Sequence, residues 1–80
     1  MKKYDFRDHY QKGDWIYYLH ISDVTNKVSI LNLKVSTLYP NIMIAYEDRG
    51  MSYCIDSKDK DKIFETESGA EEYLKEIQDE

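Results

Sequence analysis

The sequence has little cysteine, proline or glycine: its 80 residues include one cysteine, one proline and three glycines. Cys54 cannot form an internal disulfide, and a lone cysteine in an apolar strand is most often a small buried hydrophobe. Gly13, Gly50 and Gly69 are isolated in the sequence, which excludes a glycine-rich phosphate-binding loop. Neither a disulfide framework nor a nucleotide-binding loop is therefore expected.

Long hydrophobic runs are also absent. The longest unbroken apolar stretches, such as residues 42–46, have the length of a strand and are too short to span a bilayer. The first eight residues carry charges where a signal peptide would have an apolar run, which favours a cytoplasmic location. A chain of 80 residues has room for one domain with a small core.

Acidic residues outnumber basic ones by 16 to 11, and the excess of negative charge is concentrated at one end. Residues 67–80 carry six acidic side chains and one lysine, which accounts for the whole net charge of −5. The rest of the chain contains no stripe of basic residues, and the lysines near the N-terminus have acidic residues close to them in the sequence. The composition thus disfavours nucleic acid as a partner.

What the sequence does have is a series of short strand-like segments. Residues 14–21 are rich in aromatic and β-branched residues, apolar on both faces, and turn formers after Ile21 predict a hairpin. In the following segment the apolar parity changes near Ile30 and Leu31, which predicts a bulge or bend there. Further alternation predicts strands at residues 42–47 and 51–56, joined by a tight turn containing Gly50.

The last third of the chain predicts an exposed loop, a short strand and a helix. Residues 57–62 alternate acidic and basic side chains, so they predict a loop, and Ile63 and Phe64 begin the strand. Thr66 can cap the helix, although Ser68 with Glu71 offers an alternative capping box. One helix face is apolar and is expected to pack on the sheet; it consists of Ala70, Tyr73, Leu74 and Ile77.

These elements predict a single β-rich α+β domain over residues 1–80. Residues 1–12 form an N-terminal arm that docks through aromatic side chains, residues 13–65 form the sheet, and residues 66–80 form the helix. The expected architecture is either a small SH3-like antiparallel barrel or a bent sheet, with four to five strands and the C-terminal helix.

Two segments add a resemblance to a group of proteins. Residues 12–18, Lys-Gly-Asp-Trp-Ile-Tyr-Tyr, resemble the Gly-Asp-x-Val-Tyr opening strand of small uncharacterised proteins from phages and prophages of Gram-positive bacteria. Residues 63–74 are similar to their closing Phe-x-Thr-x-x-x-Ala helix, with Glu65 where leucine is usual and Gly69 where glutamate is usual. The resemblance covers about a quarter of the chain. It implies a mobile-element origin and a fold, and it carries no catalytic residue.

No residue pattern indicates an active site, a cofactor or a metal. His9, His20 and Cys54 lack the spacing that would place two ligands on one ion. The acidic stretch from Asp56 fails as a calcium loop because lysines occupy ligand positions. Cys54 sits inside a strand without a nucleophile elbow, so we expect no enzyme, no cofactor and no metal site.

Aromatic content is the unusual feature, with eight tyrosines and one tryptophan. So small a core cannot hide them all, and tyrosine and tryptophan dominate binding hot spots. The candidate partner-binding residues are four aromatic ones, Trp15, Tyr17, Tyr18 and Tyr39, expected together on the wall of the sheet. The acidic helix adds Glu71, Glu72 and Glu76 as candidates.

These features predict a non-catalytic binding protein of phage or mobile-element origin that acts on a host or phage protein. One form of this hypothesis is an inhibitor of a host defence or nucleic-acid enzyme, whose acidic helix mimics nucleic-acid phosphates. Two alternatives remain open. The first is a small nucleic-acid-binding barrel that stacks bases on exposed aromatic rings, and the second is a structural domain that forms homo-oligomers such as a homodimer through its strand edges.

Overall fold

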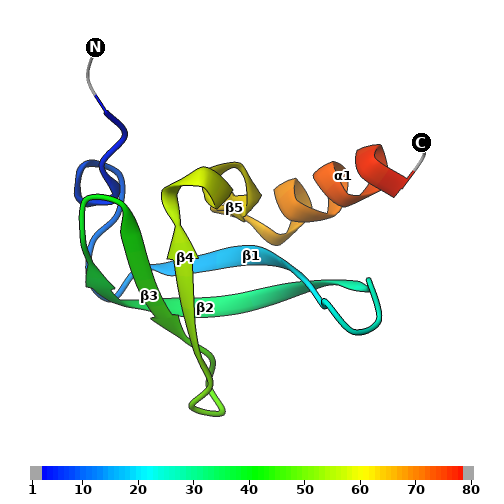
Figure 1. The fold of residues 1–80 in the computed structure, drawn as a ribbon, viewed down its shortest axis with the longest axis horizontal. Coiled ribbons are helices and arrows are strands. Elements are labelled where there is room, and N and C mark those ends of the chain that lie inside the picture. The colour runs from blue at the N-terminus through cyan, green and yellow to red at the C-terminus, as the bar shows by residue number, and fades with distance from the viewer. Residues whose placement is uncertain (1–2, 79–80) are drawn as a thin grey trace.

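The structure is a computed structural model that describes residues 3–78, and it contains strands, two short 3-10 helices and one α-helix (Figure 1). Along the chain these elements are η1 (Phe6–Asp8), β1 (Trp15–Ile21), β2 (Val28–Leu38), β3 (Ile42–Tyr46), β4 (Ser52–Asp56), η2 (Ser57–Lys62), β5 (Ile63–Phe64) and α1 (Glu67–Gln78). The end of the predicted helix, residues 79 and 80, lies outside the described residues.

The five strands form one antiparallel sheet in the order β4-β3-β2-β1-β5. Among residues 3–78 the outer strands β4 and β5 do not pair with each other, so the sheet stays open. In Figure 1, β3 and β4 run steeply across β1 and β2. The 3-10 helix η2 connects β4 to β5, the two edge strands of the bent sheet. The predicted fold class is confirmed as its bent-sheet alternative, with a C-terminal helix.

The main hydrophobic core lies on one side of the sheet, here called the core face. Side chains directly opposite each other in antiparallel strands point to the same face, and the register places Ile16 beside Leu33 and Met43 beside Ile55. The N-terminal arm closes this core with Phe6, which is fully buried. The buried cluster consists of Phe6, Ile16, Leu33, Val35, Met43, Ala45, Ile55 and Ile63.

The N-terminal arm is held at both its backbone and its side chains. The backbone N–H of Phe6 donates to the carbonyl of Pro40 in the β2–β3 turn at 3.0 Å. The ring of Phe6 meets Tyr4 edge-on at 5.4 Å between centroids and Tyr10 at 6.2 Å. The arm therefore docks through the aromatic side chains of Tyr4, Phe6 and Tyr10.

The opposite side of the sheet, here called the outer face, is covered at one end by α1. Leu19 points to this face, and it is 2% exposed although it lies outside the main buried cluster. Helix α1 contacts β1, β2 and β5, and its Ala70 is fully buried. We infer that the helix buries Leu19, which gives the domain a second, smaller apolar layer.

The predicted bulge near Ile30 and Leu31 is wrong. The pairing of β1 with β2 is regular from Trp15 opposite Lys34 to Ile21 opposite Val28. The apolar parity changes because β2 contributes Ile30 to the outer face, which the helix covers, and Leu33 to the core face. The register shift lies instead between Val35 and Thr37, where β2 changes its alignment with β3.

Thr66 caps helix α1. Its Oγ1 accepts a hydrogen bond from the backbone N–H of Gly69 at 3.1 Å, which decides between the two predicted caps. Residues 57–62 form the 3-10 helix η2 where a loop was expected, because Asp56 caps the turn by accepting from the N–H of Lys58 at 3.0 Å. No residue of η2 is buried, as its alternating charges indicated.

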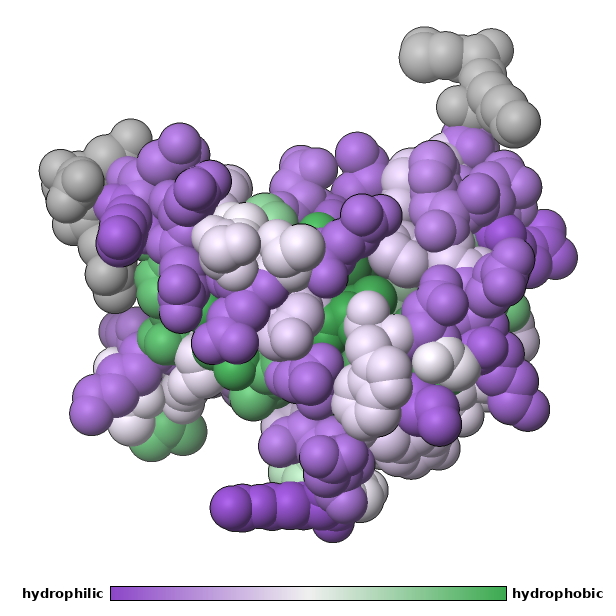
Figure 2. Space-filling model, turned by 180° about the vertical axis from the view of Figure 1, so that it is seen from behind, coloured by the Kyte–Doolittle hydropathy of each residue, from purple (hydrophilic) through white to green (hydrophobic). Residues whose placement is uncertain are grey.

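Hydrophilic side chains cover the α1 side of the molecule, and hydrophobic atoms come to the surface below it toward the β1–β2 hairpin (Figure 2). The exposed apolar side chains of these elements include Ile21, Val24 and Ile77. Within residues 3–78, no helix is long and apolar enough to cross a membrane.

Candidate functional site

The outer face carries an exposed row of side chains beyond the part that α1 covers. Lys34 of β2 is the direct partner of Trp15 in β1 and of Tyr46 in β3. Directly opposite residues share a face, so these three side chains stand next to one another across three strands. We call Trp15, Lys34 and Tyr46 the aromatic row.

Both aromatic side chains of the row are accessible to a partner. Trp15 is 48% exposed and Tyr46 is 42% exposed, in contrast to the fully buried residues on the core face of the same strands. The Nζ atom of Lys34 lies over the Trp15 ring, 5.9 Å from its centroid. A cation above an indole ring is attracted by the ring quadrupole, which helps to hold both side chains in place.

An open groove adjoins the row at the end of β1. Its volume is about 480 Å3, and it is lined by Lys12, Gly13, Lys34, Val35, Ser36 and Tyr46. Gly13 has a φ of +97°, a conformation that favours glycine, and its N–H donates to the carbonyl of Val35 at 2.8 Å. This turn brings Lys12 alongside β2.

The four aromatic residues proposed from the sequence do not form one cluster. Trp15 and Tyr17 both lie on the outer face, with Tyr17 half-buried between Asn32 and Phe64. Tyr18 points to the core face, where it packs against the main core and burial raises its pKa. Tyr39 is 50% exposed but follows the far end of β2, away from the row.

The three proposed acidic residues of the helix are all exposed. The side chains of these residues, Glu71, Glu72 and Glu76, form no hydrogen bond or ion pair with another described residue. They lie on a different element from the aromatic row, and phosphate mimicry by this helix stays a prediction.

Sequence reasoning missed Lys34 and Tyr46 as members of the site. The strand-like alternation of residues 42–46 was recognised, but only the register of β3 against β2 places Tyr46 beside Lys34. Tyr46 ends its strand next to a polar turn, a position at which an aromatic residue often stays partly exposed. That local signal could have added Tyr46 to the candidates.

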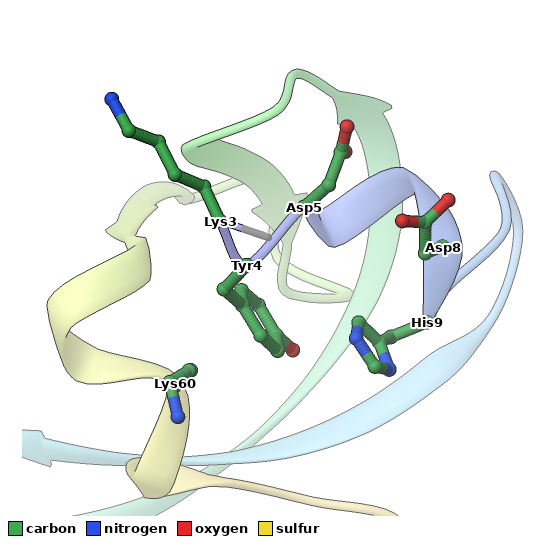
Figure 3. A pocket seen from close by; sticks show the side chains of 6 residues that line it. All are labelled: Lys3, Tyr4, Asp5, Asp8, His9 and Lys60. Atoms are coloured by element: carbon green, nitrogen blue, oxygen red, sulfur yellow. The ribbon is translucent and has the colours of Figure 1, made fainter. Parts of the chain in front are cut away.

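A second hollow, of about 420 Å3, lies where the N-terminal arm meets η2 (Figure 3). The Tyr4 ring stacks on His9 with centroids 4.5 Å apart, and the Nζ of Lys60 lies 5.1 Å from the centre of the same ring. Figure 3 also shows two carboxylates at this hollow, Asp5 and Asp8. Asp5 binds Arg7 through two side-chain hydrogen bonds. The Tyr4–His9 and Asp5–Arg7 contacts lie within the arm, and Lys60 links the arm to η2. The mixed charges of this hollow select no particular ligand.

The packing of the arm predicts a loss of stability at alkaline pH. Burial raises the pKa of Tyr10 from 10.0 to about 12, with a smaller contribution from Tyr4. The unfolded chain releases this proton near pH 10, as a free tyrosine does, and the folded chain releases it near pH 12. The free energy of unfolding should therefore fall as pH rises through this window.

Urea unfolding at a series of pH values measures this fall. Tyr10→Phe removes the phenol and should flatten the decrease, whereas Tyr39→Phe, at a half-exposed position, should leave it unchanged. A decrease of the same size in Tyr10→Phe would show that the partly buried Tyr10 hydroxyl is not its cause.

No group of three or more His, Cys, Asp or Glu side chains among residues 3–78 is placed to hold a metal ion. Cys54 was expected to be buried and is exposed. It lies opposite Ile44 on the outer face, in β4, whereas the strands that α1 contacts are β1, β2 and β5.

Comparison with known proteins adds no relative: no family model matches the chain, and no curated protein or solved structure matches it at a significant level.

Proposed function

We propose that the protein is a small, non-catalytic binding protein that docks on a partner protein through the aromatic row. The observation that carries this proposal is the exposure of Trp15 and Tyr46 side by side with Lys34 on a rigid sheet. Rigid aromatic side chains contribute a large contact area at a small cost in conformational entropy. Burial of both rings by a partner would remove the largest exposed aromatic surface of the sheet.

The surroundings of the row resemble the rim of a protein interface. Lys34 stands in the middle of the row and Lys12 lies beside it, and Asp14 and Glu65 line a small hollow that also includes Trp15. Exposed aromatic residues surrounded by polar and charged groups of both signs are typical of protein–protein interfaces. The proposal includes a cytoplasmic location and an origin in a phage or mobile element, which rest on the sequence features alone.

Capture experiments with a matched set of variants test this function. A tagged wild-type protein is expressed in a Gram-positive host and recovered with its partner, which mass spectrometry identifies. The double variant Trp15→Ala/Tyr46→Ala should recover at least about tenfold less of that partner, because truncating a central aromatic residue commonly costs about 2 kcal/mol or more.

The control is Val24→Ala, which removes an apolar side chain that is 93% exposed in the β1–β2 turn. This control should recover as much partner as the wild type. Circular dichroism must show that all three proteins are folded. Equal recovery by the double variant and the control would contradict docking through the aromatic row, and so would the absence of any specific partner.

A further inference from the structure

The groove beside the aromatic row has an unusual charge for this protein. Two of its six lining residues are lysines, and no aspartate or glutamate among residues 3–78 lines it. The two other hollows both include carboxylates, Asp5 and Asp8 in one and Asp14 and Glu65 in the other. In a chain with a net charge of −5, this groove is a local positive site.

The backbone beside the groove leaves the groove accessible. Gly13 has no side chain, and a Cβ at its position would meet no atom within 4 Å, so the space above it is free. The N–H of Val35 donates to the carbonyl of Asp14 at 2.8 Å, which fixes the segment containing Lys12 against β2. The lysine side chains are thus carried by a firmly paired backbone.

We propose that the groove binds the carboxylate of an acidic side chain in an extended segment of the partner protein, while a neighbouring apolar residue of that segment packs on the aromatic row. This inference rests on the proposed function, because it assigns the chemistry of the partner to the same surface. Ammonium groups form charge-assisted hydrogen bonds with carboxylates, and these are about twice as strong as neutral ones. Tyr46 belongs to both the groove and the row, so one segment can reach both.

The charge distribution favours a peptide over a nucleic acid. Residues 1–66 have no net charge, and residues 67–80 are strongly acidic. A nucleic acid brings a phosphate at every nucleotide, and its binding depends on several lysines or arginines along its path. Two lysines beside two exposed aromatic rings match a segment that carries one or two carboxylates.

Fluorescence measurements with defined peptides test the assignment. The probe is a fluorescein-labelled dodecapeptide that repeats Glu-Leu-Asp-Tyr, and its neutral counterpart has Gln and Asn in place of Glu and Asp. Polarisation reports binding, and the emission of Trp15, the single tryptophan, reports contact with the row. The acidic peptide should bind the wild type at least about tenfold more tightly than the neutral one, and added salt should weaken it.

Charge reversal identifies the lysines responsible. Lys12→Glu/Lys34→Glu should raise the dissociation constant of the acidic peptide by at least about tenfold. The matched control Lys27→Glu/Lys58→Glu makes the same change in net charge at two exposed lysines outside the groove, and it should change the constant by less than about threefold. Equal binding of both peptides, no binding of the acidic peptide, or equal effects of the two double variants would overturn the inference.

Two further readouts separate this inference from the proposed function and from nucleic-acid binding. If a captured partner is lost with Trp15→Ala/Tyr46→Ala but retained with Lys12→Glu/Lys34→Glu, the proposed function is supported. The inference that the groove binds an acidic segment is then contradicted. If both double variants retain the partner, the proposed function is contradicted. Tighter binding of a fluorescein-labelled twelve-nucleotide oligothymidine than of the acidic peptide would assign the surface to single-stranded nucleic acid instead.

Discussion

Phe6→Ala is expected to remove most of the free energy of unfolding of the protein at 25 °C. Phe6 lies in the N-terminal arm, outside the sheet, yet its side chain is fully buried in the main cluster. Truncating a buried phenylalanine costs about 3–5 kcal/mol, because the transfer free energy is lost and a cavity remains. A domain of this size has a total stability near the low end of about 5–15 kcal/mol.

Urea unfolding followed by far-ultraviolet circular dichroism measures this effect. The matched control is Arg7→Ala in the same 3-10 helix, whose side chain is exposed and pairs with the nearby Asp5. The control should keep a midpoint close to that of the wild type. A Phe6→Ala variant with an unchanged midpoint would show that the arm is not part of the folded core.

Leu19→Ala is expected to give the second large loss of stability, about 2–5 kcal/mol. Leu19 points to the outer face and is 2% exposed, which requires that α1 stays packed on this end of the sheet. The truncation leaves a cavity between strand and helix, so the helix should also become easier to open. Hydrogen exchange at the amides of α1 reports such opening separately from global unfolding.

Ile21→Ala is the control for this second prediction, because Ile21 lies on the same strand and face and is 42% exposed. Its truncation removes the same kind of apolar side chain without leaving a comparable cavity, so the loss in urea midpoint should be distinctly smaller. Equal losses for the two variants would contradict the second apolar layer under α1.

Features that depend on neighbours in sequence were predicted well. The alternation of apolar residues located the strands, since a strand buries every second side chain wherever it pairs. Thr66 was named as a cap because its hydroxyl can reach a backbone N–H three residues ahead, and this hydrogen bond is present. Gly50 was placed in a tight turn, and its φ of +91° explains the choice of glycine.

Features that depend on distant neighbours were predicted poorly. The change of parity at Ile30 and Leu31 was taken to indicate a bulge or bend, although the pairing with β1 is regular and each face of the strand has a different cover. Cys54 was expected to be buried because its sequence neighbours are apolar. It lies opposite Ile44 on the outer face, where it is exposed. Tyr18 was assigned to a binding surface and lies against the core.

The candidate site follows the same division. Trp15 could be named from the sequence because its aromatic segment has more rings than a small core can bury. Lys34 and Tyr46 could not be joined to it, because alternation within one strand does not tell which residue of another strand lies opposite. That pairing depends on the register of β2 with both of its neighbours and on the shift between Val35 and Thr37.

The sequence by itself determined where the strands, the turns and the start of the helix lie, because those choices depend on hydrogen bonds and side-chain alternation within a few residues. Only the tertiary structure decided which face of each strand is covered and which side chains share the exposed row. The physical reason is that burial of a side chain depends on the element packed above it, and in this fold the arm covers one face and α1 the other.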